Sequence, residues 1–219
     1  MASGRSTVLL TGFGPFPSVP ANATSLLVPR IAEAARLAYP GINFEVRTLP
    51  TEWGAGLAHL DDHYESLAPA VALHFGVSSR ARGFEIEARG VNRCAFLPDA
   101  AGVFPSTPAL SESGADYLVS TVPVSAIVAR LRAKGLPAFV SRDAGTYLCN
   151  ATLYSALDKA RRSARDYRIG FVHLPASLLV EERRPQFGPH PRCPLTWRDT
   201  IDGGLEIIGA ALGREAVRR

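Results

Sequence analysis

The chain has 219 residues, of which 47% are hydrophobic and 20% are charged, and its formal net charge is +4 at pH 7. This length suits a sizeable buried core, so we predict a single domain over residues 1–219. The arginines are scattered rather than gathered with aromatic residues in one stripe, which argues against nucleic-acid binding. No apolar run approaches the ~20 residues of a membrane span, which argues against membrane insertion.

The three cysteines, Cys94, Cys149 and Cys193, lie far apart and cannot all pair with one another. The chain opens without the long apolar stretch of a signal peptide. Both observations favour the reducing cytoplasm, where a cysteine is free, metal-bound or catalytic.

Hydrophobic periodicity alternates between strand and helix along the chain. We expect strands or strand-to-loop segments at 6–16, 42–50, 70–79, 83–92, 138–145 and 167–175, and helices at 22–39, 54–68, 146–164 and 196–216. Residues 115–135 read as a strand fragment followed by a helix that ends at Gly135. Thr196 and Asp199 fit a capping box at the start of the last helix. The alternation predicts a three-layer α/β/α domain with a largely parallel central sheet.

Active sites in such folds lie beyond the carboxyl ends of the strands. This rule selects the loops after Leu10, Phe75, Val140 and Val172. We therefore expect these four loops to meet at one rim of the sheet.

The first of these loops, "GFGPFP", does not fit a dinucleotide-binding loop. Pro17 stands where the third glycine belongs, and Pro15 and Pro17 lack the N–H groups that would hold a phosphate. We expect a rigid loop that presents Phe13 and Phe16 as an apolar pocket wall.

Other common catalytic and metal-binding patterns are absent from the sequence. There is no G-x-S-x-G motif of a serine hydrolase. His190 and Cys193 form H-x-x-C in a Pro-rich loop, but two ligands are too few for a structural zinc site. Cys94 has no partner pattern and reads as a structural residue, so we expect neither metal nor cofactor.

Cys149 lies in "SRDAGTYLCNATLY", where a loop leads into a predicted helix. With Thr146 as a plausible N-cap, Cys149 falls in the first helical turn, where the helix dipole favours a thiolate and free N–H groups can hold an oxyanion. A thiolate nucleophile needs a base. His173 ends the next strand on the same rim, and His74 also ends a strand and competes for this role. Glu85 and Glu87 alternate onto one strand face, so periodicity does not choose a third member between them.

The segment around Cys149, followed by "GFVHLP", resembles the signature of pyroglutamyl peptidase I (pyrrolidone carboxyl peptidase), a family of cysteine peptidases. The opening "VLLTGFGPFPSVPANATSLL" is similar to that family's first strand and loop, and the spacing from Cys149 to His173 also agrees. The family's catalytic glutamate precedes an asparagine by five positions, as Glu87 precedes Asn92. The resemblance thus implies Cys149 as nucleophile, His173 as base and Glu87 as the third member.

The resemblance also implies a substrate pocket and shows two departures from the family pattern. Its implied pocket residues are Phe13 and Phe16 around the lactam ring, Val77 at the lactam amide, and Tyr147 and Leu148 beside the nucleophile.

The arginine that many members carry near the oxyanion, before a Pro-Asp pair, is missing before Pro98; Arg89 or Arg93 is the expected substitute. The usual N-P after the opening loop is Asn22-Ala23.

The function implied by the resemblance is removal of amino-terminal pyroglutamate from peptides through an acyl-enzyme, without a cofactor. N-terminally pyroglutamylated peptides are the expected partners, and the family's frequent tetramers suggest a homo-oligomer. Two alternatives stay open at this point. One is a related cysteine hydrolase of another lactam or cyclic amide, and the other is a non-catalytic binding module on the same fold.

Overall fold

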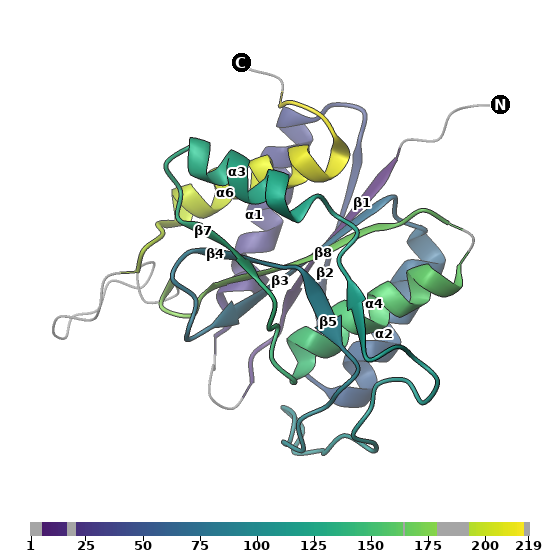
Figure 1. The fold of residues 1–219 in the computed structure, drawn as a ribbon. Helices are drawn as coiled ribbons and strands as arrows, with labels where there is room; N and C mark the ends of the chain where they lie inside the picture. The colour runs from purple at the N-terminus through teal and green to yellow at the C-terminus, as the bar shows by residue number, and fades with distance from the viewer. Residues whose placement is uncertain (1–5, 17–20, 164, 179–192, 217–219) are drawn as a thin grey trace, which may run out of the picture.

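A six-stranded sheet organises the molecule (Figure 1). The computed structural model describes residues 6–16, 21–163, 165–178 and 193–216. The strand order is β2-β1-β3-β8-β4-β7, and the bounds are β1 Thr7–Phe13, β2 Asn43–Leu49, β3 Val71–Ser78, β4 Phe84–Glu87, β7 Ala138–Ser141 and β8 Arg168–Pro175. The central strands β3 and β8 are near-continuous runs of buried residues, as expected for strands covered on both faces.

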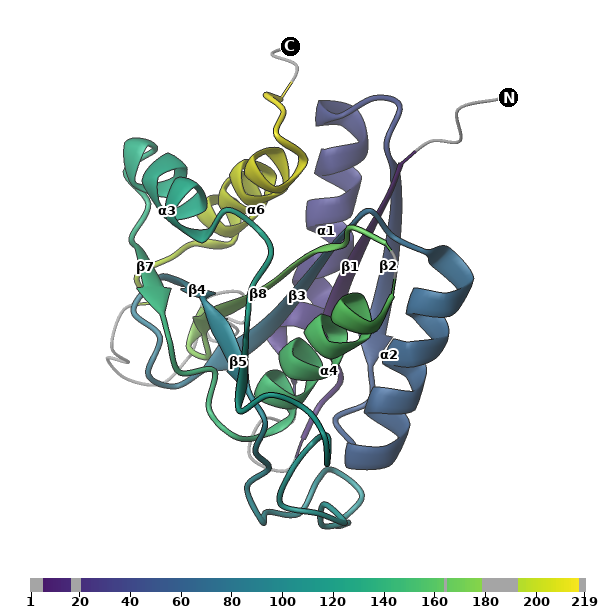
Figure 2. The same ribbon diagram turned by 45° about the vertical axis from the view of Figure 1, so that its right-hand side comes forward.

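Helices cover both faces of this sheet (Figure 2). On one face lie α1 (Ala23–Ala38), α3 (Val124–Ala133) and α6 (Trp197–Leu212), which pack on one another and on the sheet. On the other face lie α2 (Trp53–Leu67) and α4 (Leu148–Arg162). Each face encloses its own apolar core. The predicted three-layer α/β/α architecture is confirmed, whereas the prediction of one domain over residues 1–219 stays a prediction.

Two strands run against the other four. The pairs β1–β2, β1–β3 and β3–β8 are parallel, but β4 pairs antiparallel with β8 and parallel with β7. The sheet is largely parallel as predicted, but β7 runs against β3 and β8, so the rule of strand carboxyl ends does not by itself place its loop on their rim. Its loop still reaches that rim, because residues 142–147 lead from β7 to the start of α4.

The predicted strand at residues 83–92 divides after Glu87. Its second half, β5 (Arg89–Val91), leaves the main sheet and pairs antiparallel with β6 (Tyr117–Val119). The buried Asn150 of α4 holds this ribbon, since its amide accepts from Val91 N and donates to Val91 O.

The start of α1 fixes the loop after β1. Asn22 caps the helix by accepting from Thr24 N, and Thr24 Oγ1 accepts from Phe13 N. Gly12 permits this contact, because a Cβ there would lie 2.6 Å from Thr24 O. Pro17 lies outside the described residues.

Of the two helix starts predicted from the sequence, one is confirmed and the other is wrong. The capping box of Thr196 and Asp199 is confirmed. The N-cap of α4 is Tyr147 rather than Thr146, and no side chain caps that helix. Its first N–H groups therefore lack a capping side chain.

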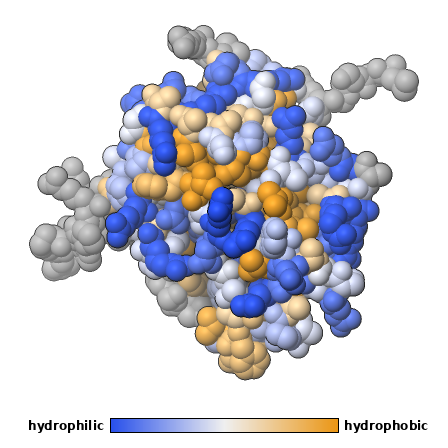
Figure 3. Space-filling view, in the orientation of Figure 1, coloured by the Kyte–Doolittle hydropathy of each residue, from blue (hydrophilic) through white to orange (hydrophobic). Residues whose placement is uncertain are grey.

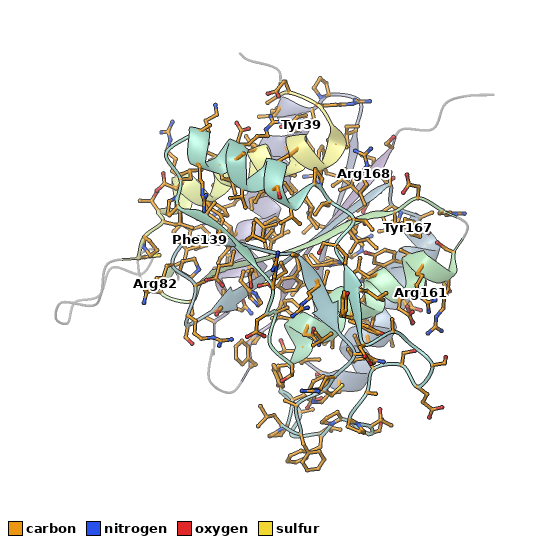
Figure 4. The ribbon with its side chains drawn as sticks, viewed as in Figure 1. Tyr39, Arg82, Phe139, Arg161, Tyr167 and Arg168 are labelled. Carbon is orange, nitrogen blue, oxygen red and sulfur yellow. The ribbon has the colours of Figure 1, made fainter. Side chains whose placement is uncertain are left out.

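Apolar surface gathers on the face that carries β7 (Figure 3). The exposed apolar side chains of β6 and of the edge strand β7 include Val119, Phe139 and Val140. Figure 4 shows Phe139 on this edge, where the Arg132 guanidinium lies 5.8 Å from its ring centroid. Among the described residues, no helix is long and apolar enough to cross a membrane.

Candidate active site

A cavity of about 740 Å³ opens where β1, β3 and β8 end and α4 begins. Cys149 and His173 line it, and so do all five pocket residues that the resemblance implied. These five are Phe13, Phe16, Val77, Tyr147 and Leu148. These residues come from four separate stretches of the chain and meet in one place.

Cys149 is the second residue of α4. The buried side chains of this helix, including Leu148, Ala151 and Leu157, anchor it on the sheet and hold its first turn at the cavity. Gly145 allows the chain to turn into the helix with a φ of +77°. Cys149 therefore lies beside free N–H groups at the positive end of the helix dipole, which stabilises a thiolate.

Gly76 in β3 makes room for the sulfur. A Cβ at this position would lie 3.0 Å from Cys149 Sγ and 2.8 Å from Phe171 Cζ. Because Gly76 is paired in register with His173 on β8, the missing side chain lets the thiol settle over the strand next to the imidazole. The role of Gly76 was not predicted from the sequence, although a glycine near the end of a buried apolar run can indicate a close approach of another group.

His173 is buried, and its Nδ1 lies 2.7 Å from Glu87 Oε1. A carboxylate accepts, so Nδ1–H donates and the other ring nitrogen is left for the Cys149 sulfur. Burial lowers the pKa of His173, but the Cys149 thiolate and the Glu87 carboxylate together raise that pKa to about 10. The geometry thus favours a thiolate–imidazolium pair supported by a buried carboxylate.

The structure separates the two glutamates. Glu87 is fully buried and contacts the imidazole, whereas Glu85 is partly exposed and lines the cavity. Glu87 Oε2 has no hydrogen-bond partner among the described residues, so the interaction with His173 is the main compensation for this buried carboxylate. Glu87 is thus the carboxylate placed to orient His173.

His74 does not reach the cavity. It is fully buried between Thr11 Oγ1, 2.8 Å from Nδ1, and the Tyr64 hydroxyl, 3.1 Å from Nε2. Burial lowers the pKa of His74 to about 3, so the ring stays neutral. The competition for the role of base therefore favours His173.

Two stretches of the chain form the apolar wall of the cavity: the end of β1 with the loop after it, and the residues that lead into α4. Phe13 is buried at the end of β1 and packs on Phe171, with ring centroids 6.2 Å apart. Phe16 is half-buried. Tyr147 packs edge-on against Trp53, and its hydroxyl donates to Pro98 O, which fixes the residue before Leu148.

Arg89 does not lie at this cavity. Its guanidinium donates to Arg142 O and lies over the ring of Tyr117. The arginine that lines the cavity is Arg80, which lies 3.6 Å from Asp143 and is largely exposed. Arg80 was not predicted from the sequence, because it lies in the loop two residues beyond the end of β3 rather than on the strand itself.

Of the remaining sequence candidates, Cys94 and Cys193 do not line the cavity. Cys94, Cys149 and Cys193 are all free thiols. No group of three or more His, Cys, Asp or Glu side chains there is arranged to hold a metal ion. His190 lies outside the described residues.

The comparisons with known proteins agree with this geometry. The family model described as pyroglutamyl peptidase matches residues 6–190. A pyrrolidone-carboxylate peptidase 1 of Ralstonia nicotianae is 35% identical over 92% of this chain and 90% of its own, and a pyrrolidone-carboxylate peptidase of Chromobacterium violaceum is 37% identical over 77% of each. The crystal structure of pyroglutamyl peptidase I from Bacillus amyloliquefaciens superposes with a TM-score of 0.81 at 26% identity, over 97% of this chain and 100% of that one.

The fold and these matches define a cysteine peptidase. The chain belongs to the pyroglutamyl peptidase family. This membership confirms the resemblance seen in the sequence and favours pyroglutamyl-peptidase activity over the two alternatives left open there.

Proposed function

We propose that this chain hydrolyses the amide bond after an amino-terminal pyroglutamyl residue, with Cys149 as nucleophile and His173 as acid and base. One observation carries the proposal. A cysteine at a helix start, an imidazole held by a buried carboxylate, and an apolar wall share a single cavity. Glu87 is the positioning residue in this scheme, because its carboxylate contacts the imidazole and Glu87 does not line the cavity.

The chemistry follows from the positions of these groups. The Cys149 thiolate attacks the pyroglutamyl carbonyl, and the oxyanion is stabilised by the free N–H groups of the first turn of α4. His173, as imidazolium, gives its proton to the leaving amine and leaves a thioester on Cys149. The neutral imidazole then takes a proton from water, which attacks the thioester, releases pyroglutamate and restores the thiolate.

The pocket suits a neutral, flat ring. Pyroglutamate is cyclised and has no ammonium group, so an aromatic wall is a favourable receptor. In this proposal Phe13 and Phe16 flank the ring, the backbone of Val77 pairs with the lactam amide, and Tyr147 and Leu148 close the side near Cys149. Proline has the same ring without the lactam carbonyl, so discrimination rests on the amide contacts.

The proposed reaction also has consequences for the substrates, the need for a cofactor and the compartment of the enzyme. N-terminally pyroglutamylated peptides are its substrates, and none of its steps requires a cofactor. A reducing compartment such as the cytoplasm suits a free catalytic thiol. A homo-oligomer stays a prediction that rests on the family resemblance.

The test is the release of a fluorophore from pyroglutamyl aminomethylcoumarin compared with prolyl aminomethylcoumarin. We expect cleavage of the first and a kcat/KM at least a hundredfold lower for the second. Equal cleavage of both, or cleavage of neither by folded enzyme, would remove the proposed function.

A further inference from the structure

The cavity is larger than the pyroglutamyl ring. Its volume of about 740 Å³ exceeds what one five-membered ring fills. Its lining also includes polar and charged side chains, here called the polar end, which are Ser78, Arg80, Glu85, Ser141 and Asp143. This end requires an occupant of different chemistry from the ring.

Glu85 lies beside the catalytic imidazole at this polar end. Its Cα is paired directly with that of His173 in the antiparallel ladder between β4 and β8, so both side chains stand on one face of the sheet. Glu87, two residues further on the same face, takes the hydrogen bond to the imidazole. The carboxylate of Glu85 makes no hydrogen bond or ion pair with any other residue that the structure describes.

The reaction puts the leaving group next to this carboxylate. His173 must lie within hydrogen-bond reach of the leaving nitrogen in order to protonate it. The residue after pyroglutamate carries that nitrogen, so its side chain starts within a few bonds of His173. A long side chain on this residue can therefore reach Glu85.

We infer that Glu85 is a specificity-determining residue which favours a lysine or arginine directly after the pyroglutamyl residue. The inference rests on the proposed function. A half-buried carboxylate without a partner attracts a cation more strongly than a fully exposed one, because water screens it less. A glutamate in the second position of the substrate would instead meet a like charge.

The other charged side chains of this end also favour a positively charged side chain in the substrate. Arg80 is the one lysine or arginine among the described lining residues, and it is largely exposed and lies 3.6 Å from Asp143. Two carboxylates and one guanidinium thus leave an excess of negative charge where the leaving residue lies. Arg80 is also partly neutralised by its neighbour, so it competes weakly for an acidic leaving residue.

The experiment uses three peptides, pyroglutamyl-Xaa-Ala-amide, in which Xaa is Lys, Gln or Glu. For the wild type we expect kcat/KM to fall from Lys to Gln to Glu by roughly fivefold at each step, mainly through KM. Glu85→Gln should reduce the Lys-to-Glu ratio at least fivefold, and Glu85→Lys should reverse the order. Asp143→Asn is the matched control, because it removes the other carboxylate of this end and should keep most of the ratio.

Three results would overturn the inference. One is a wild type that does not distinguish the three peptides, and another is a preference that Asp143→Asn removes and Glu85→Gln keeps. The third is a Glu85→Gln variant that lowers kcat equally for all three, since Glu85 would then act through His173. Pyroglutamyl aminomethylcoumarin separates this failure from that of the proposed function: an enzyme that cleaves it without charge preference refutes only the role of Glu85.

Discussion

The catalytic chemistry of this chain depends on which side chains surround one imidazole. The sequence indicated Cys149 and His173 through their positions at a helix start and a strand end. It did not separate Glu85 from Glu87 on periodicity, because a period of two puts both on one face. The choice depends on the register of β4 against β8, which is a contact between residues far apart in the chain.

Glu87→Gln tests the positioning role of the buried carboxylate. The variant should lower kcat roughly tenfold or more, because the imidazole loses the charge that orients and supports its protonated form. Since Glu87 raises the pKa of His173, its loss should also move the alkaline limb of the pH profile of kcat/KM to lower pH. The measurement is kcat/KM for pyroglutamyl aminomethylcoumarin across pH.

Glu85→Gln is the control for this experiment, because it removes the same charge two residues away on the same strand face. It should lower kcat much less and leave the alkaline limb close to that of the wild type. A larger loss at Glu85 would transfer the positioning role to that residue.

The aromatic wall has two residues with different degrees of burial. Phe13 is 3% exposed and packs in the core, whereas Phe16 is half-buried. Loss of either aromatic side chain should cost about 1–3 kcal/mol of transition-state binding, or roughly 5- to 150-fold in kcat/KM. Phe13→Ala should in addition lower the free energy of unfolding by about 3 kcal/mol, and Phe16→Ala by much less.

Activity and thermal unfolding of the two variants should be measured on the same preparations. If the folded double variant still cleaves the pyroglutamyl amide at the wild-type rate, the substrate ring does not bind between these side chains.

At the scale of the elements, the site is a junction between strand ends and the first turn of α4. Periodicity located most helices and strands, and the capping box of Thr196 and Asp199 was readable from four residues. The break after Glu87 was not readable, because residues 83–92 alternate without interruption. It arises where β5 turns to pair with β6 and to contact Asn150 of α4.

Gly76→Ala tests the contact between β3 and α4. The added methyl would lie 2.8 Å from Phe171 Cζ and 3.0 Å from Cys149 Sγ, closer than Cβ atoms normally approach, so the ring and the sulfur beside His173 are both pushed from their places. We expect kcat/KM to fall on the order of a hundredfold, because small misplacements of a nucleophile are costly. The far-ultraviolet circular dichroism should stay that of the wild type.

Gly54→Ala is the matched control, since a Cβ there meets no atom within 4 Å. Equal activities of the two alanine variants would show that the sulfur does not depend on the space at Gly76.

At the scale of the whole molecule, the layered architecture followed from the alternation of strands and helices, but the direction of β4 and β7 did not. A strand pattern carries no information about which neighbour it joins or in which sense, so the antiparallel pairing of β4 with β8 was not predicted. The position of Arg80 at the cavity and the displacement of Arg89 from it follow from the same tertiary arrangement. Family membership adds the reaction type, and the described geometry adds which side chains are placed to perform it.

The central claim is that Cys149 performs the attack on the pyroglutamyl amide. The most direct test is the kcat/KM of Cys149→Ala on pyroglutamyl aminomethylcoumarin, with thermal unfolding as the check on folding. We expect a folded protein whose turnover falls by about 10³-fold or more, matched by inactivation of the wild type with a thiol-alkylating reagent. A folded Cys149→Ala variant that keeps more than about a tenth of the wild-type kcat/KM, a deficit below about 1.4 kcal/mol, would contradict it.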